Sequence, residues 1–465
     1  MNTENAAFEG PSARDIFGEA MGRRQAAPRV IDIGTHGTSV NRVSISGVSR
    51  IRAGFLNTLL EPVFAAQTVA QAVAESREAA GKLRALGIAK DVAIELDQAA
   101  DNKPGVDVCF SCEDGSRYAI RTGVNVGDDE GTAGVTGRLN NIWGGGEALE
   151  ANYTRGSKTQ AAFMGALTVP VRADPQRQAE LSATQAAVDS RPYSAHTEVR
   201  RTLGAAYRAS AFDGTSHELR YSAAWREICN LGAAASPTLR SEAGHTLKSS
   251  VAYTFTRDDR DSRIVPTQGN LVRATAELAG LLGDVRFAKA QAELQTSQRI
   301  GASEYVVAAG VQGGLMCGLG VGRTPLADRF FLGGQTNVRG FEFRGIGPRD
   351  HNDSIGGDVF YAAGVSLLTP LPYVRTPALR GHVWANAGQL ALLDDRGLLR
   401  KTSRGSAPID EIRRFLMRPS VAVGLGLVYR HSMVRVELSC GLPLVAALTD
   451  RPKAGLQFGL GVQFL

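Results

Sequence analysis

Residues 328–341 of this chain read Asp328-Arg329-Phe330-Phe331-Leu332-Gly333-Gly334-Gln335-Thr336-Asn337-Val338-Arg339-Gly340-Phe341. The adjacent glycines allow backbone conformations that are closed to other residues. The arginine near the end of the segment carries a planar fork of donors at the tip of a turn. The segment therefore predicts a glycine-rich loop that presents one arginine. A surface loop with a chance Arg-Gly-Phe explains the last three residues equally well, so the flanking sequence has to separate the two interpretations.

The sequence on both sides of this loop alternates polar and apolar residues with a period of two. In Lys289–Gln295, four polar residues alternate with two alanines and a leucine, and the same pattern recurs in Val272–Leu278 and Val434–Cys440. Such alternation is typical of strands with one apolar and one polar face. A soluble sandwich with a wet outer face fits it as well. Strands of about 9–14 residues that recur without intervening helices favour a membrane barrel.

Sixteen strands are expected from residue 117 to the end of the chain, and an even number suits a closed antiparallel barrel. The glycine-rich loop lies between the eleventh and the twelfth strand. A short amphipathic helix is expected within residues 392–418. The expected strands are 117–126, 132–142, 147–155, 159–170, 178–189, 194–210, 215–229, 245–257, 269–280, 285–299, 303–316, 357–368, 379–391, 419–430, 432–440 and 455–465.

The first and last strands are expected to pair, because a bilayer tolerates no open sheet edge. Both strands contain glycines, and glycine inside a strand weakens its pairing. A weak junction that opens exposes N–H and C=O groups, which can pair with a strand of another chain. The sequence therefore predicts a lateral gate formed by Gly123, Val124, Asn125, Val126, Gly127, Gln457, Gly459, Gly461, Val462 and Phe464.

The N-terminal part of the chain has a different pattern from the strand-rich remainder. A strand, two helices and two further strands are expected, in the order β-α-α-β-β, which predicts a small α+β domain. The expected elements are 40–47, 51–63, 67–86, 91–97 and 106–110.

These motifs together resemble the BamA-type outer-membrane assembly barrels. In that family the arginine of the loop anchors it inside the barrel lumen. The resemblance thus implies a loop anchor made of Val338, Arg339, Gly340, Phe341, Gly333 and Gly334. Residues 257–269 resemble the Asp-x-Arg…Pro-Thr-x-Gly turn of the family. The last strand is similar to the β-signal of mitochondrial outer-membrane barrels. The single N-terminal domain resembles a POTRA (polypeptide-transport-associated) domain, which points to the central barrel subunit of the mitochondrial sorting and assembly machinery.

The resemblance implies a mostly β chain with a flexible segment at residues 1–28, a POTRA domain at 29–115 and a 16-stranded antiparallel transmembrane β-barrel at 116–465. It implies insertion and folding of β-barrel precursor proteins in the mitochondrial outer membrane, by β-signal pairing at the lateral gate. The POTRA domain would lie in the intermembrane space. The lipid bilayer and accessory subunits of an assembly complex are the further partners that it implies.

The partner of Arg339 is a separate question. Bacterial members of the family usually carry aspartate where this chain has Asn386, in the segment His382–Gly388. A neutral amide can accept a hydrogen bond but cannot form an ion pair, and a buried arginine without an acidic partner is costly. Glu437, on the polar face of a neighbouring strand, is the first candidate for the charge partner. Asp358 is the second.

Composition argues against several other classes of protein. No apolar run reaches the ~18 residues of a spanning helix. Residues 1–28 lack the apolar core of a secretory signal and contain four acidic residues, which favours a membrane reached from the cytosol. The five cysteines and seven histidines are scattered, so neither a disulfide framework nor a metal site is expected.

No catalytic or nucleotide-binding motif occurs, so we expect neither an enzyme nor a cofactor. A net charge of +6 without a basic run argues against nucleic acid as a partner. A passive outer-membrane pore and a protein-translocating channel of a plastid envelope remain as alternative functions.

Overall fold

The computed structural model describes residues 37–48, 50–98, 105–127, 130–301, 303–320, 323–372, 378–393, 413, 415–431 and 434–461. The expected flexible segment at residues 1–28 and most of the expected loop helix within 392–418 lie outside them.

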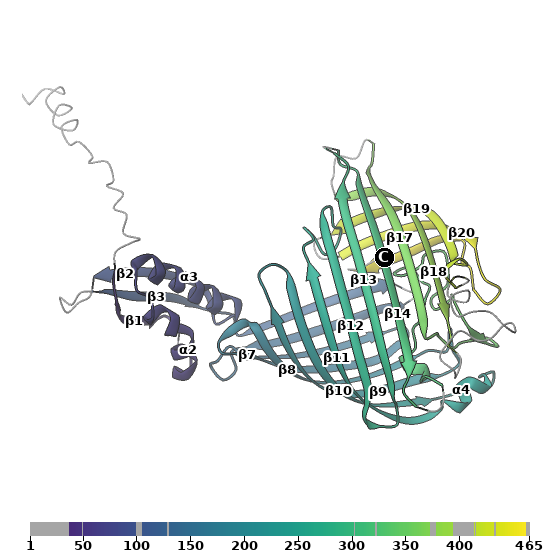
Figure 1. Ribbon diagram of the computed structural model, residues 1–465, viewed down its shortest axis with the longest axis horizontal. Helices are drawn as coiled ribbons and strands as arrows, with labels where there is room; N and C mark the ends of the chain where they lie inside the picture. The colour runs from purple at the N-terminus through teal and green to yellow at the C-terminus, as the bar shows by residue number, and fades with distance from the viewer. Residues whose placement is uncertain are drawn as a thin grey trace, which may run out of the picture.

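The N-terminal domain has the expected order β-α-α-β-β, and Figure 1 shows it at one end of the barrel. Helix α3 begins after Thr68, whose side chain accepts a hydrogen bond from the backbone N–H of Gln71. One face of this helix buries Leu83 in a core that includes Val108 and Phe110 of the sheet. None of the described helices combines the length and hydrophobicity that a membrane-spanning helix needs. The elements are β1 (Val40–Ser46), α2 (Ala53–Phe64), α3 (Val69–Ala85), β2 (Ala89–Gln98) and β3 (Val106–Asp114), with sheet order β1-β3-β2.

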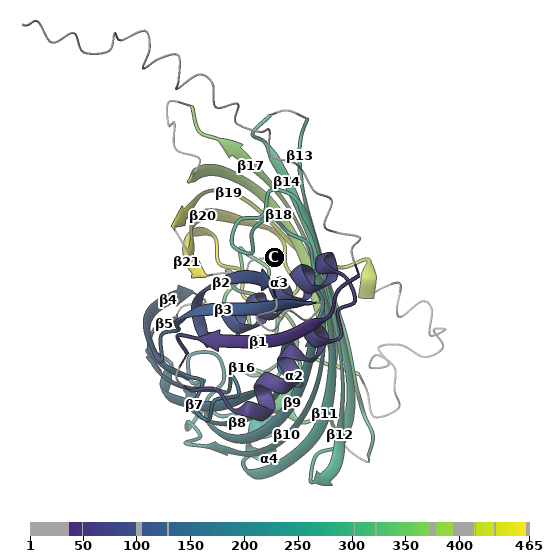
Figure 2. The same cartoon turned by 90° about the vertical axis from the view of Figure 1, so that its left-hand side faces the viewer.

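Sixteen antiparallel strands form one curved sheet, which confirms the predicted fold class (Figures 1 and 2). Each of these strands pairs with the barrel strands that come directly before and after it along the chain. Strand β8 begins at Asp174 instead of residue 178, because Arg172 and Ala173 both adopt positive φ and form the turn themselves. The strands are β4 (Tyr118–Gly127), β5 (Glu130–Asn140), β6 (Ala148–Gly156), β7 (Thr159–Val171), β8 (Asp174–Asp189), β9 (Thr197–Ser210), β10 (Thr215–Cys229), β11 (Gly244–Asp258), β12 (Gly269–Gly283), β13 (Phe287–Arg299), β14 (Val306–Gly318), β17 (Val359–Pro370), β18 (Leu379–Ala391), β19 (Ser420–His431), β20 (Val434–Val445) and β21 (Gly455–Gly461).

Short elements lie in the loops between these strands. They are α4 (Pro237–Ser241), the 3₁₀ turn η2 (Leu326–Asp328), β15 (Arg349–Asp350) and β16 (Asp353–Ser354).

The two faces of the barrel strands differ as the alternation predicts. Leu203 of β9 and Leu219 of β10 are 66% and 52% exposed on the outer face. Arg208 of β9 and Glu218 of β10 form an ion pair of 2.7 Å on the inner face. An apolar outside and a polar lumen are the arrangement that a barrel in a bilayer requires.

The two ends of the sheet, β4 and β21, lie side by side, and we call their junction the seam (Figure 2). Strand β4 pairs with β5, and β21 pairs with β20. No backbone hydrogen bond joins β4 to β21 within the described residues 118–127 and 455–461. The prediction that the first and last strands pair is therefore wrong for these residues. Gly123 in β4 and Gly459 in β21 offer no side chains for cross-strand contacts, so little holds the two edges together.

The long loop between β14 and β17 lies inside the barrel over its described residues 323–358, and we call it the lumen loop. Its apolar side chains pack on the inner wall, where Leu332 also forms a β-bridge with Ile346 of the same loop. This packing gives the barrel an internal hydrophobic core. The core contains Phe330, Leu332, Val338, Phe341 and Ile346 of the loop and Met316, Phe360, Trp384, Leu390 and Ala422 of the wall.

Candidate functional site: the lumen loop and the seam

Arg339 is fully buried and contacts the barrel wall through its guanidinium group. Its Nε donates to Glu437 Oε1 at 2.8 Å, and its Nη2 donates to Oε2 at 3.4 Å. Its Nη1 lies 3.5 Å from Asn386 Oδ1. The guanidinium carbon also lies 5.6 Å from the ring centroid of Trp384, a cation–π distance. The structure thus has the ion pair expected with Glu437, whereas Asn386 makes a long, neutral contact with Arg339 and donates to the backbone C=O of Asn337 at 3.0 Å.

Glu437 also meets two further side chains. Arg435 Nη2 donates to Glu437 Oε2 at 2.7 Å, and His382 Nδ1 lies 3.4 Å from Oε1. Glu437 and His382 are both buried. One carboxylate therefore faces two guanidinium groups, so removing it would take away the shared partner of two buried positive charges, which is costly.

Asp358 does not pair with Arg339, so its assignment as the second candidate partner is wrong. Its carboxylate accepts hydrogen bonds from the Thr324 hydroxyl and, at 3.0 Å, from the backbone N–H of Leu393. These two contacts occupy the carboxylate at the beginning of β17, where it fixes the base of the lumen loop.

Position 340 requires glycine, both because of its backbone conformation and because a neighbouring side chain leaves no room for a Cβ atom. Its φ is +82°, and a Cβ atom at this position would lie 2.6 Å from the Cβ of Ala422. Its N–H donates to Gln457 Oε1 at 3.3 Å, and its C=O accepts from the N–H of Lys453 at 2.9 Å. The loop tip is therefore hydrogen-bonded to β21 and to the turn that precedes it.

The other residues of the expected loop anchor lie in the same part of the lumen loop. Gly333 and Gly334 have φ of +103° and +118°, values that favour glycine. The next residue, Gln335, is buried and donates to Ser439 Oγ of β20 at 2.8 Å. Val338 and Phe341 are both buried in the internal core. The structure thus brings together all six residues that the resemblance implied.

The anchor and the C-terminal side of the seam form one site. In the β20–β21 ladder, Glu437 lies opposite Gly459, and Ser439 lies opposite Gln457. Gly461 lies opposite Arg435 in the same ladder. The residues of β20 that hold the lumen loop are therefore direct neighbours of the strand that borders the seam.

The β4 side of the seam is less closely packed. Gly123 pairs with Gly134 of β5, and no atom lies within 4 Å of a Cβ built on Gly123. Val124 is 64% exposed on the outer face. The side chains of Asn125 and Val126 lie outside the described part of the structure, and Gly127 is described only as the last residue of β4. Val462 and Phe464 of the expected gate lie beyond the described residues.

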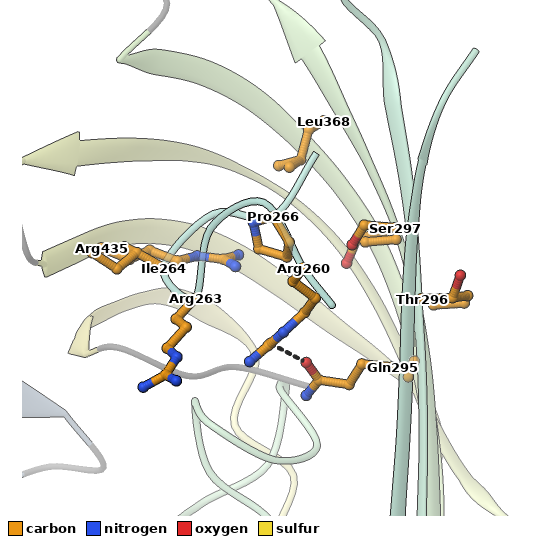
Figure 3. Close-up of a pocket in the computed structure, with 14 residues that line it drawn as sticks. Arg260, Arg263, Ile264, Pro266, Gln295, Thr296, Ser297, Leu368 and Arg435 are labelled. Carbon is orange, nitrogen blue, oxygen red and sulfur yellow. Dashed lines mark hydrogen bonds between the residues drawn. The ribbon is translucent and has the colours of Figure 1, made fainter. Parts of the chain in front are cut away.

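The turn between β11 and β12, residues 259–268, reaches into the lumen at the end nearer the N-terminal domain. Arg260 donates to Asp258 Oδ1 at 2.8 Å and to Gln295 Oε1 at 2.9 Å. Burial alone raises the pKa of Asp261, but hydrogen bonds from the side chain and N–H of Thr267 hold that pKa below its ordinary value. Figure 3 shows the turn beside a pocket that is lined by Arg260, Arg263, Ile264, Pro266, Gln295, Ser297, Leu368 and Arg435, among others. The charged residues of this turn thus form contacts that fix its shape.

Sequence reasoning did not identify His382, Arg435 or Gln335 as part of the anchor. Arg435 shares a strand face with Glu437, and His382 shares one with Asn386, so the period-two pattern does carry this information. What it does not carry is the register of β18 against β20, which lie on either side of β19.

Residues 141–464 match the family model described as the Omp85 superfamily domain. The chain belongs to the Omp85 superfamily. This Omp85 chain is 31% identical over 440 residues to a SAM50-like protein of Schizosaccharomyces pombe, covering 92% of this chain and 90% of that relative. It is 31% identical over 436 residues to the sorting and assembly machinery component 50 homolog of Homo sapiens, with the same shares covered.

Solved structures show the same Omp85 fold. The structure of BamA from Haemophilus ducreyi lacking POTRA domains 1–3 aligns with a TM-score of 0.73 at 15% identity. The alignment covers 91% of this chain and 84% of that one. CdiB from Acinetobacter baumannii aligns with a TM-score of 0.55 over 91% of this chain. These likenesses concern the fold of the barrel.

Proposed function

We propose that this Omp85 protein inserts β-barrel precursor proteins into the mitochondrial outer membrane and folds them there. The observation that carries the proposal is the seam, at which β4 and β21 are unpaired within the described residues and lie beside an anchored lumen loop. The SAM50-like protein and the sorting and assembly machinery component 50 homolog, each of which matches 92% of the chain, support it.

The proposed mechanism is strand exchange at the seam, without bond chemistry. Strand β4 pairs only with β5 among the described strands, so its other edge presents N–H and C=O groups that can add an extended strand. Ile120 and Val124 of β4 are 77% and 64% exposed on the outer face. A precursor strand that adds to β4 in register would direct its own apolar residues to the bilayer. The β-signal of the precursor is the segment that we expect to pair there.

The lumen loop positions the opposite side of the seam in this mechanism. Its contacts to Glu437, Gln457 and Lys453 lie on β20, on β21 and in the turn between them. The last two strands can therefore move only if these contacts break or if the loop tip moves with them.

We further propose that the N-terminal domain is a POTRA domain in the intermembrane space, and that it guides precursors to the barrel. Arg52 forms an ion pair with the buried Glu147 in the β5–β6 turn, and its backbone N–H donates to Gly144 O at 2.8 Å. Asn141 Nδ2 donates to Arg50 O at 2.8 Å. These contacts hold the domain at one mouth of the barrel. We also expect accessory subunits in the assembled complex.

Site-specific crosslinking of a β-signal peptide tests the proposal. A photoreactive residue at Val124 on β4 should crosslink the peptide, and one at Leu278, on the outer face of β12, should not. A peptide with its apolar signal residues replaced by alanine is the control for specificity. Equal crosslinking at both positions, or none at β4, would contradict strand addition at the seam. Ion conductance without peptide binding would instead favour a passive pore.

A further inference from the structure

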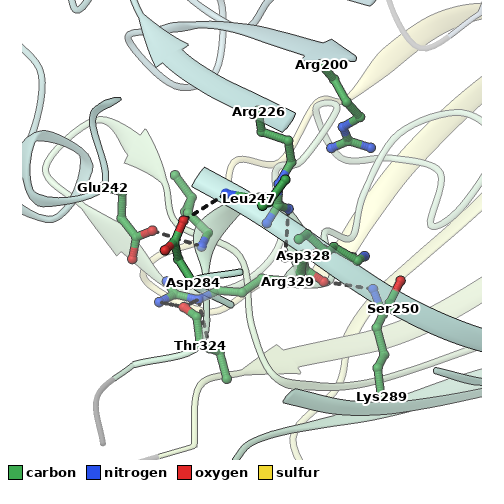
Figure 4. Close-up of polar contacts among 12 residues, drawn as sticks. Arg200, Arg226, Glu242, Leu247, Ser250, Asp284, Lys289, Thr324, Asp328 and Arg329 are labelled. Atoms are coloured by element: carbon green, nitrogen blue, oxygen red, sulfur yellow. Dashed lines mark hydrogen bonds and ion pairs between the residues drawn. The ribbon is translucent and has the colours of Figure 1, made fainter. Parts of the chain in front are cut away.

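A second buried charge cluster holds the lumen loop at its base, far from Arg339. Asp328, the residue before Arg329, is 7% exposed. Arg226 Nη1 of β10 donates to Asp328 Oδ2 at 2.7 Å (Figure 4). Lys248 Nζ of β11 donates to Asp328 Oδ1 at 2.9 Å. Lys289 Nζ of β13 donates to the backbone C=O of Asp328 at 2.7 Å. Side chains from three strands thus contact one residue of the lumen loop.

The charge of Arg226 depends on Asp328, whereas Lys248 also pairs with Glu277 at 2.6 Å. Arg226 is 2% exposed, and Asp328 is its ion-pair partner among the described residues. Within that part of the chain, its Nε and Nη2 atoms have no hydrogen-bond partner. Burial alone raises the pKa of Asp328, but Arg226 and Lys248 outweigh it and hold that pKa below its ordinary value. Removing the carboxylate would leave a buried guanidinium group uncompensated, which is costly.

The two clusters lie on different parts of the barrel. In the sheet, β10, β11 and β13 are the seventh, eighth and tenth strands counted from β4, and so lie opposite the seam. The contacts of Arg339 and Gly340 are on β18, β20 and β21, the thirteenth, fifteenth and sixteenth strands. The lumen loop therefore connects the wall opposite the seam with the strands that border it.

The segment after Arg339 returns to the wall opposite the seam. Asp353 Oδ1 accepts from the N–H of Ala195 at 2.8 Å, and its Oδ2 accepts from the N–H of Ser236 at 2.7 Å. Ala195 lies between β8 and β9, and Ser236 lies between β10 and β11. The returning segment is thus attached to the wall opposite the seam, although Gly347 N–H also donates to Asp450 Oδ1 at 3.0 Å in the turn between β20 and β21.

We propose that Asp328 is a positioning residue, the fixed end of the lumen loop, and that it holds the loop in the lumen independently of the Arg339–Glu437 contact. The inference rests on the proposed function, in which the last strands move when the seam opens. The tip with Arg339 is then the part of the loop that moves or releases, and the contacts of Asp328 keep the loop in place for its return.

Trypsin cleavage within the loop can measure the two attachments separately. Arg329 directly follows Asp328, and Arg339 is itself the partner of Glu437. Arg329 and Arg339 are both buried. Cleavage after each is followed by mass spectrometry in the full-length protein in membranes. Each rate is divided by the rate at the same site in the urea-unfolded variant, which removes the effect of the neighbouring acid on trypsin. The variants are Asp328→Asn, Glu437→Gln and both together. The control is Glu342→Gln, which removes an exposed ion pair between the same loop and Arg451 of the β20–β21 turn.

Asp328→Asn should raise cleavage after Arg329 by roughly tenfold or more, because a buried ion pair is broken, and should change cleavage after Arg339 by less than about twofold. Glu437→Gln should do the reverse, and the double variant should expose both sites. Asp328→Glu, which retains the charge, should restore most of the protection at Arg329. Lys248→Gln, a milder change for use if Asp328→Asn fails to fold, should raise cleavage after Arg329 alone by a smaller factor.

Release of both sites to the same extent by Asp328→Asn would overturn the independence of the two ends, and continued protection of Arg329 would overturn the anchor itself. Insertion of a labelled precursor is measured in parallel. Loss of the cleavage pattern with normal insertion refutes this inference alone, whereas the expected cleavage pattern in a wild-type protein that inserts nothing refutes the proposed function.

Discussion

Replacing Glu437 by glutamine is the change that should most weaken the seam side of the barrel. Glutamine keeps the shape of the side chain but removes the charge that faces Arg339 and Arg435. Arg339 and Glu437 are both 0% exposed, so water cannot replace the lost partner. Breaking a buried ion pair from one side costs about 3–5 kcal/mol. Glu342→Gln removes an ion pair whose side chains are 36% and 46% exposed, so it should cost less than about 1 kcal/mol.

Urea unfolding of the refolded protein in detergent or lipid measures this difference. With Trp143 and Trp225 replaced by phenylalanine, the fluorescence of buried Trp384 beside Arg339 reports on the site. A double-mutant cycle with Arg339→Gln separates the pair from its surroundings. The double variant should be less destabilised than the sum of the two single variants. A loss below about 1 kcal/mol for Glu437→Gln, or additive losses in the cycle, would refute the conclusion that this pair anchors the loop.

Three further predictions follow from single contacts. Gly340→Ala should destabilise the barrel by about 1–3 kcal/mol in the same urea assay, because the new Cβ would meet Ala422 and the φ of +82° is unfavourable; unchanged stability would contradict the required close approach. The difference in unfolding free energy between wild type and Asp328→Asn should be constant from about pH 7 to pH 5 and should shrink below about pH 4. The reason is that a carboxylate with a depressed pKa in the folded state stabilises the fold above its unfolded pKa and loses this effect as pH falls through its folded pKa. A difference already lost at pH 5 would be inconsistent with this. Arg52→Gln should speed proteolysis between the N-terminal domain and the barrel, since the contact to Glu147 joins the two; unaltered proteolysis would argue against that contact.

Much of the barrel could be predicted from the sequence because strand periodicity is a local property. A lumen strand such as β20 shows its two faces directly, and this is how Glu437 was identified as a candidate partner. Strand ends were harder to place. The turn at Arg172 and Ala173 uses positive φ without glycine, so nothing in the local sequence indicates that β8 starts there.

Contacts between distant strands could not be predicted in the same way. Asp358 has the correct charge and lies near the loop in sequence, yet Thr324 and Leu393 occupy it. His382 and Arg435 join the anchor through the order and register of three strands, which no single segment encodes. The first and last strands were expected to pair through a weak junction, and the described residues 118–127 and 455–461 show no such ladder. Barrel closure removes every edge only if the last ladder forms, and the glycines at Gly123 and Gly459 weaken that ladder.

The measurement that tests the account most directly is precursor insertion with the seam locked. Cysteine pairs are placed along β4 and β21 in a chain whose five native cysteines have been replaced, and pairs that oxidise are compared before and after reduction. The account predicts that the disulfide stops insertion of a labelled β-barrel precursor, that reduction restores it, and that a cysteine pair between β11 and β12 has no effect. Normal insertion by the protein with its seam disulfide fully formed would contradict the central claim that precursors enter the membrane between β4 and β21.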